Sequence, residues 1–184
     1  DLYGIRFKIQ SGNEPDADVM VQDVITQLRQ ICGELRPPVL APFGLKKAIK
    51  AHADSFAERE GAPTVDLRLD NDGQTIPEDV RLALYRVYQE SMNNLLKHAE
   101  AGKVTVVLSV NEASVELSIE DDGKGFVLPT SWIELGRKDH FGLLGLSERV
   151  SALGARLNVR TSPGNGTRIY VLVEDVNRAS GLQS

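Results

Sequence analysis

The sequence has little of several features that mark common classes of protein. Cysteine occurs once in 184 residues, which excludes an internal disulfide and a zinc site built from several cysteines. Lys and Arg number 21 against 26 for Asp and Glu, so the chain lacks the basic excess that sequence-independent nucleic-acid binding requires. No apolar run approaches the roughly 18 residues that span a bilayer. We therefore predict no nucleic-acid partner and no membrane contact by this chain.

The composition is that of a folded protein. Apolar residues make up 41% of the chain and charged residues 26%, and the length suits one ordinary domain with a smaller element beside it. The chain begins at Asp1 without a methionine, and its first residues do not form a signal peptide. We therefore expect a fragment of a longer protein, and a cytoplasmic, reducing location for this part of it.

Residues 1–38 have a helical pattern. In residues 19–35 the apolar side chains recur at spacings of three and four, and apolar residues near the start indicate an earlier, shorter helix. Pro37 and Pro38 end the second helix, because proline disrupts the helical hydrogen-bond ladder and restricts the residue before it. We predict a helical hairpin over 1–38, whose apolar stripes need a partner such as a second copy of the chain, and a hinge over 39–43.

Residues 44–176 alternate between helical and strand patterns, and residues 177–184 form a tail without either. Helices gathered on one face of a mixed, mostly antiparallel sheet are the architecture that this order predicts, a two-layer α+β domain. The expected helices are 45–56, 77–99 and 143–153, and the expected strands are 65–69, 104–110, 115–119, 157–159 and 169–173.

The long helix carries a polar constellation. Glu90, Asn94 and His98 follow one another at a spacing of four, so they share one face of the helix, and Lys97 lies beside them. An asparagine amide oxygen suits Mg²⁺, and a carboxylate one turn away can act as a general base. By itself the pattern also fits a solvated helix face.

Three glycine motifs follow the helix. The run DDGKGF over 121–126 comes where a strand ends. A carboxylate there can accept a hydrogen bond from an exocyclic amine, and the two glycines let the backbone approach a flat ring closely. The run GLLG over 142–145 opens a helix, whose first amides can bind phosphate. The run GNGT over 164–167 fits a hairpin turn. Each motif alone also fits an ordinary turn or helix start, so the information lies in their order and spacing.

The ordered set resembles the sensor histidine kinases of two-component signalling, in particular the subfamily of nitrate-sensing and membrane-fluidity-sensing kinases. ESMNNLLKHA resembles the N box of that family, DDGKGF its first glycine box, GLLGLSERV its second and GNGT its last. LRPPVLAPFGLKKAI resembles the hinge into the catalytic domain. The resemblance implies the Bergerat ATP-binding fold of the wider GHKL ATPase group.

The resemblance also implies a nucleotide site with ATP and Mg²⁺. Glu90 would act as general base on the attacking imidazole, Asn94 would hold Mg²⁺, and Asp121 would accept from the adenine amino group. The other nucleotide-binding residues that it implies are Lys97 and His98 near the phosphates, Gly123 and Gly125 in the pocket wall, Gly142, Leu143 and Gly145 at the triphosphate, and Thr167 behind the adenine. Residues 127–141, which include Trp132 and His140, would form a lid, and Asp122 would be either a supporting or a solvated residue.

One departure from the family concerns the phosphoacceptor, a histidine followed by an acidic residue on the first hairpin helix. His52 is followed by Ala53 and lies past the hinge, His98 belongs to the N box, and His140 belongs to the lid. We therefore expect the chain to begin just downstream of the phosphoacceptor, to bind ATP, and not to phosphorylate itself.

The predicted function is transfer of the ATP γ-phosphoryl group to a histidine on the dimerisation helix, for relay to an aspartate of a response-regulator receiver domain. A homodimer through the hairpin is implied with it. Two alternatives are a GHKL serine kinase acting on a transcription-factor partner, which the hairpin and hinge argue against, and a degenerate receiver-binding scaffold. Intact Glu90, Asn94 and Asp121 argue against the scaffold.

Overall fold

A computed structural model of the chain describes residues 40–73, 75–128 and 141–176. All of them belong to the second of the chain's two units, Val39–Ser184. The predicted hairpin over 1–38, nearly all of the predicted lid and the predicted tail lie outside the described residues. The domain boundaries drawn from the sequence therefore stay predictions.

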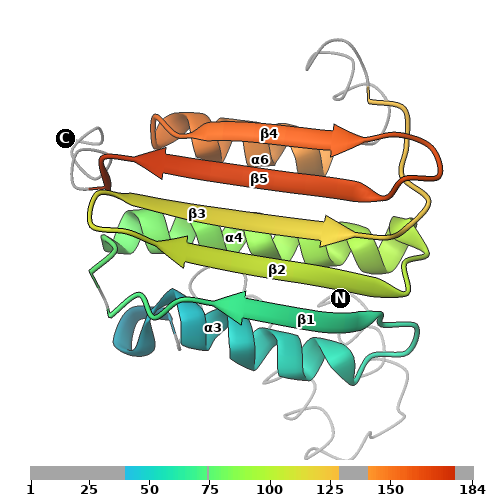
Figure 1. The fold of residues 1–184 in the computed structure, drawn as a ribbon, viewed down its shortest axis with the longest axis horizontal. Helices are drawn as coiled ribbons and strands as arrows, with labels where there is room; N and C mark the ends of the chain where they lie inside the picture. Colours follow the sequence, from blue (N-terminus) through green and yellow to red (C-terminus); the bar gives the residue numbers. More distant parts are fainter. Residues whose placement is uncertain (1–39, 74, 129–140, 177–184) are drawn as a thin grey trace, which may run out of the picture. The chain divides into compact units, whose positions relative to one another are not determined.

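The described part is built on a five-stranded sheet in the order β1-β2-β3-β5-β4. Strand β1 runs parallel to β2, and all other neighbouring strands are antiparallel. The helices α3, α4 and α6 lie on one face of the sheet (Figure 1). The predicted two-layer α+β fold with a mixed, mostly antiparallel sheet is thereby confirmed. The strands are β1 (Thr64–Leu69), β2 (Lys103–Val110), β3 (Ser114–Asp121), β4 (Arg156–Thr161) and β5 (Thr167–Glu174), and the helices are α3 (Leu40–Ala57), α4 (Glu78–Asn94) and α6 (Phe141–Ala152).

The core lies between the sheet and its helices. Successive side chains of a strand point to opposite faces, so the alternating apolar residues of each strand bury one face and leave the other open. Buried side chains of the three central strands meet those of α4. The buried strand residues are Val104, Val106 and Leu108 of β2, Val115, Leu117 and Ile119 of β3, and Ile169, Val171 and Val173 of β5.

The long helix predicted over 77–99 is not uniform. Its regular part, α4, begins after Pro77 with Glu78 and Asp79 in the first turn, where acidic side chains favour the helix dipole. After Asn94 the chain continues as a π-helix, η1 (Leu95–Ala99), which ends at Glu100 in a left-handed conformation with φ 53°. The expectation of one continuous α-helix was therefore wrong for the last turn. Such wider turns occur often at functional sites.

Helix α3 begins earlier than the sequence predicted and contains a kink. Residues 40–43, expected as a hinge, are helical, and Gly44 then breaks the helix with φ 83° and ψ 175°. Proline at position 42 is compatible with this short first piece, because the backbone N–H groups of a first helical turn have no acceptor within the helix and the N–H that proline lacks is not missed. Beyond the kink, the buried Asp72 accepts a hydrogen bond from the Leu45 amide at 2.7 Å. A carboxylate from a distant loop thus caps the second piece of α3.

Loss of this cap has a measurable cost. We expect Asp72→Ala to lower the free energy of unfolding by about 1–3 kcal/mol, because the buried Leu45 amide loses its acceptor. Urea unfolding followed by circular dichroism measures the difference. The exposed Asp54 of α3 is the matched control, and its alanine variant should stay within about 0.5 kcal/mol of the parent. Equal losses in both variants would contradict the capping role.

Candidate nucleotide-binding site

A cavity of about 330 Å³ opens at the end of the domain where η1, the last residues of β3 and the first of β5 come together. Helix α6 contributes the side chain of Leu143. The lining residues are Ser91, Asn94, Leu95, Lys97, His98, Ala99, Ile119, Asp121, Lys124, Gly125, Phe126, Leu143, Thr167 and Ile169. Segments from four of the predicted motifs thus meet around one space.

The structure brings together most of the residues that the sequence singled out. Those that line the cavity are Asn94, Lys97, His98, Asp121, Gly125, Leu143 and Thr167. Those that do not are Glu90, Gly123 and Gly145. Glu90 lies one helical turn before Asn94, half-buried, and its Oε1 accepts a hydrogen bond from Asn94 Nδ2 at 3.2 Å.

Asp121 provides the acceptor on the floor of the cavity. It is the last residue of β3, it lies directly across from Thr167 of β5, and it is half-buried. Its Oδ1 accepts a hydrogen bond from the Gly123 amide at 2.9 Å. Burial raises the pKa of this carboxyl above the usual range of an aspartate, an effect that the backbone amides of Gly123 and Thr167 partly offset.

Apolar side chains form the walls around Asp121. Ile119 and Ile169 are cross-strand partners one step along the sheet from the carboxylate. Leu95, Phe126 and Leu143 line the cavity from the elements around them. Of these five side chains the sequence predicts only Leu143 as a site residue, because the apolar pattern of the others indicates core. A carboxylate at the floor of an apolar cavity suits a flat heterocycle that carries an exocyclic amine.

The helix side of the cavity is polar. Lys97 and His98 of η1 are exposed, whereas Asn94 at the end of α4 is half-buried. Ser91, which the sequence argument missed, donates to the Val87 carbonyl at 2.7 Å, so its hydroxyl is bound to its own helix. Asn94 gives an N–H to Glu90, and its amide oxygen is therefore the atom left for a cation. Cationic or neutral donors here suit an anionic ligand group.

The first glycine motif is tied to its surroundings through its backbone. The Lys124 amide donates to the Ala99 carbonyl at 2.8 Å, and the Lys124 carbonyl accepts from the Gly164 amide at 2.7 Å. The Gly166 amide donates to the Gly123 carbonyl at 2.8 Å. These bonds join the motif to the end of η1 on one side and to the β4–β5 turn on the other. The loop is thus built as a fixed wall of the cavity.

Asp122 has a structural role. Its Oδ1 accepts hydrogen bonds from the amides of Gly102 and Lys103, each at 2.9 Å. These two amides lie at the start of β2, so the Asp122 carboxylate provides the hydrogen-bond acceptor for the beginning of that strand. The sequence left Asp122 as either supporting or solvated. Its contacts place it among the residues that hold the motif in position.

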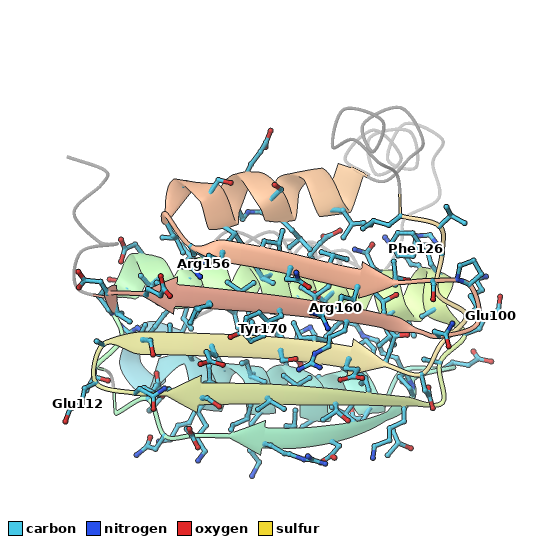
Figure 2. The ribbon with its side chains drawn as sticks, turned by 45° about the horizontal axis from the view of Figure 1, so that its top comes forward. Glu100, Glu112, Phe126, Arg156, Arg160 and Tyr170 are labelled. Atoms are coloured by element: carbon cyan, nitrogen blue, oxygen red, sulfur yellow. The ribbon has the colours of Figure 1, made fainter. Side chains whose placement is uncertain are left out.

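Lys124 and Glu100 close the outer edge of the loop. Lys124 Nζ lies 2.7 Å from Glu100 Oε1, and this ion pair lowers the pKa of the Glu100 carboxyl. Both side chains are largely exposed, so the pair adds little stability. Figure 2 shows Glu100 and Phe126 at the same end of the sheet. The ion pair between Lys124 and Glu100 holds the side chain of Lys124 in position. Lys124 lines the cavity and belongs to the motif, but the sequence assigned it no role.

The second glycine motif lies within α6. Gly142 belongs to the first turn of that helix, whose amides have no acceptor inside the helix. Gly145 lies in the following turn, where a Cβ would meet only the end of Arg149 at 4.0 Å. Gly142 therefore lies in the part of the helix that phosphate binding uses, and the roles of both glycines stay predictions.

The raised pKa of Asp121 predicts a pH dependence of ligand binding. The ionised carboxylate is the better acceptor for an amine, so affinity for adenosine should fall as the pH drops through this raised pKa. The loss should begin at a higher pH than for an ordinary aspartate. Calorimetric titration with adenosine, which carries no phosphate, measures the effect. Asp121→Asn should bind weakly with a flat profile, and a parent profile equally flat would contradict the assignment.

Comparison with known proteins gives concordant results. The family model described as Histidine kinase-, DNA gyrase B-, and HSP90-like ATPase matches residues 79–177. The chain is 34% identical over 158 residues to the signal transduction histidine-protein kinase/phosphatase DegS of Brevibacillus brevis, covering 86% of this chain and 39% of that protein. It is 28% identical over 145 residues to the nitrate/nitrite sensor protein NarX of Escherichia coli, covering 79% of this chain and 23% of that protein.

Solved structures show the same fold. The histidine kinase domain of the blue-light activated histidine kinase of Erythrobacter litoralis EL346 superposes with a TM-score of 0.58 at 23% identity, covering 75% of this chain and 62% of that chain. This chain spans less than half the length of the two curated relatives named above. Among residues 40–73, 75–128 and 141–176, none of the helices has the length and hydropathy of a membrane-spanning segment.

Proposed function

Because the chain belongs to the family of histidine kinase-, DNA gyrase B- and HSP90-like ATPases, we propose that it is the ATP-binding catalytic part of a two-component sensor histidine kinase. It transfers the γ-phosphoryl group of ATP to a histidine on a dimerisation helix, for relay to a receiver-domain aspartate. The homodimer through residues 1–38 and a cytoplasmic location of this part belong to the same proposal. The serine-kinase alternative is not favoured, since the relatives named above are a histidine kinase and a nitrate/nitrite sensor.

One observation carries the proposal. The half-buried Asp121 lies at the floor of an apolar cavity whose other side presents Asn94, Lys97 and His98. The floor suits the adenine ring and its amino group, and the polar side suits a triphosphate. ATP binding follows from the ATPase family. The lining of this cavity supports it as the site where ATP would bind in that orientation.

Phosphoryl transfer at this site needs few chemical groups. A histidine nitrogen forms a bond to the γ-phosphorus while the bond from that phosphorus to the β–γ bridging oxygen breaks, and ADP leaves. The proton of the attacking imidazole passes to the Glu90 carboxylate. Glu90 does not line the cavity and is held beside it by the hydrogen bond from Asn94, so its carboxylate would meet the imidazole next to the bound nucleotide. Such transfer depends mainly on positioning and charge neutralisation, which these residues provide.

His52 is unsuited to be the acceptor. It belongs to α3 and is half-buried against α4. Its Nδ1 lies 3.1 Å from Tyr88 Oη, and its ring packs against Phe56 and Tyr85. Burial lowers the pKa of this imidazole, with a further contribution from Arg59. These contacts support the expectation that the chain alone does not phosphorylate itself.

Mg²⁺ fits the donor set at Asn94. The protein part of the site would be the Asn94 amide oxygen, because Asn94 lines the cavity and its N–H already bonds to Glu90, and phosphate oxygens would be the other ligands. The ion would supply charge neutralisation at the phosphates. We expect the increase in ADP affinity on adding Mg²⁺ to be about tenfold smaller in Asn94→Ala than in the parent. Adenosine binding should be the same in both proteins. Calorimetry with and without Mg²⁺ tests this, and an equal loss for adenosine would contradict the metal role.

The proposed activity is tested with γ-labelled ATP. The chain is incubated alone and with a separate fragment that carries a histidine-bearing dimerisation hairpin. We expect acid-labile label on the fragment, formed slowly and in proportion to fragment concentration, and none on the chain. Acid-labile label at His52 would refute the expectation that the chain alone does not phosphorylate itself. Acid-stable label on a serine of a partner would support the serine-kinase alternative.

A further inference from the structure

The face of the sheet turned away from the helices carries an unusual cluster on β4 and β5. The strand register sets three β4 residues directly across from three β5 residues on this open face, and together they line a shallow groove. We name it the Arg–Tyr groove. Its cross-strand pairs are Arg156 with Leu172, Asn158 with Tyr170 and Arg160 with Arg168. Figure 2 shows Arg156, Arg160 and Tyr170 on this side of the sheet.

Two of the three groove arginines pair with carboxylates of the residues that the structure describes, and the third does not. Arg160 and Arg168 lie directly opposite each other, an arrangement of like charges that destabilises a sheet. Arg156 NH2 lies 2.9 Å from Glu174 Oε2, and Arg168 Nε lies 3.7 Å from Glu120 Oε2. Within the part of the chain that the structure describes, Arg160 has no ion pair. One exposed guanidinium is thus left for an anion from outside.

The composition of the groove is that of a protein interface. Its cations are all arginines, and Tyr170 lies between them with its hydroxyl donating to Glu116 Oε2 at 2.9 Å. That hydrogen bond fixes the ring against the sheet. Arginine and tyrosine are enriched at the energetically important points of protein interfaces, whereas lysine is depleted there. A sheet face that contacts only water does not require arginine and tyrosine in place of lysine.

We propose that the Arg–Tyr groove is a docking site for an acidic segment of a partner protein. Carboxylates of the partner pair with the guanidinium groups, above all with that of Arg160, in the bidentate geometry that arginine favours. A nucleic acid is a poorer occupant. Its phosphates follow one another without a break and need a continuous run of cations, whereas Glu174 and Glu120 already pair with two of the three groove arginines and leave Arg160 as a single site.

The groove is separate from the nucleotide site. Ile169 points into the cavity on the helix side of β5, while its chain neighbours Arg168 and Tyr170 line the groove on the other side. A change of Arg160 therefore removes a groove cation without touching a cavity residue. Nucleotide binding can serve as the test of correct folding for every groove variant.

The test uses the full chain and three probes: a short peptide of alternating Glu and Ala, the same peptide with Gln for Glu, and a short single-stranded DNA. Fluorescence anisotropy measures their affinities. We expect the Glu peptide to bind best and the double variant Arg156→Ser/Arg160→Ser to weaken it at least about tenfold. Arg68→Ser is the matched control, because Arg68 is an exposed arginine on the same open face, on the strand β1 at the other edge.

The possible outcomes decide the proposal in both directions. A loss of Glu-peptide affinity in the double variant alone, with ADP binding unchanged in both variants, supports docking at the groove. A Gln peptide that binds as well as the Glu peptide would overturn it, as would an equal loss in Arg68→Ser. Tighter binding of the DNA than of the Glu peptide would refute the acidic protein as occupant.

Discussion

In the Glu90→Gln variant, phosphoryl transfer from ATP to a histidine-bearing fragment should fall by about 10²–10⁴-fold, the range that general-base catalysis contributes. ADP binding should stay within about twofold of the parent. Glutamine keeps an oxygen that can accept from Asn94 Nδ2, so Asn94 stays oriented while the base is removed. Because Glu90 does not line the cavity, its loss should not reach the nucleotide. Single-turnover transfer of γ-label measures the rate.

The control for this variant is Glu120→Gln, which also removes one carboxylate but on the open face of the sheet, beside Arg168. Its transfer rate should match the parent. If Glu90→Gln loses ADP affinity as strongly as it loses transfer, the division between a base at Glu90 and a ligand site at Asn94 is wrong. If neither changes, the proton of the imidazole leaves by another route.

The sheet was predictable because its signal is local. Alternation of apolar and polar residues in 104–110 and 115–119 determines both the strand and the face that is buried. Helices between strands then determine a two-layer arrangement. The parallel pairing of β1 with β2 follows from the helix α4 that connects them.

The polar part of the site was also predictable, since its residues fall in motifs of fixed spacing. Asn94, Lys97 and His98 meet Asp121 and Thr167 around one cavity, although more than twenty residues separate the motifs in the chain. The apolar walls at Ile119 and Ile169 were not predictable as site residues. A strand that ends at a cavity has the same pattern as one that ends in the core.

Two features depend on contacts between distant residues and leave no local signal. The cap that Asp72 provides to Leu45 joins residues 27 positions apart in sequence, and the sequence around Asp72 indicates only a turn. In the π-helical turn at 95–99 the backbone hydrogen bonds join residues five apart, whereas those of an α-helix join residues four apart. Its sequence, LLKHA, suits an α-helix equally well.

The glycines of the first motif provide the second large prediction. Gly125 has φ 57°, and a Cβ at this position would overlap the carbonyl oxygen of Ser162 in the β4–β5 turn. We expect Gly125→Ala to lower the free energy of unfolding by about 2–5 kcal/mol, from the left-handed backbone and the overlap together. Because the loop also forms the cavity wall, ADP affinity should fall at least about tenfold at temperatures where the variant is folded.

The β4–β5 turn offers a matched control for this variant. Gly164 has a similar left-handed backbone, with φ 80°, but a Cβ there meets nothing within 4 Å. Gly164→Ala therefore carries the backbone strain without the overlap, and we expect it to cost about 1 kcal/mol and to bind ADP nearly as the parent does. Urea unfolding and calorimetry of both variants separate the two effects. Equal losses would mean that the left-handed backbone alone requires glycine at 125, and that the close approach of Ser162 does not shape the cavity.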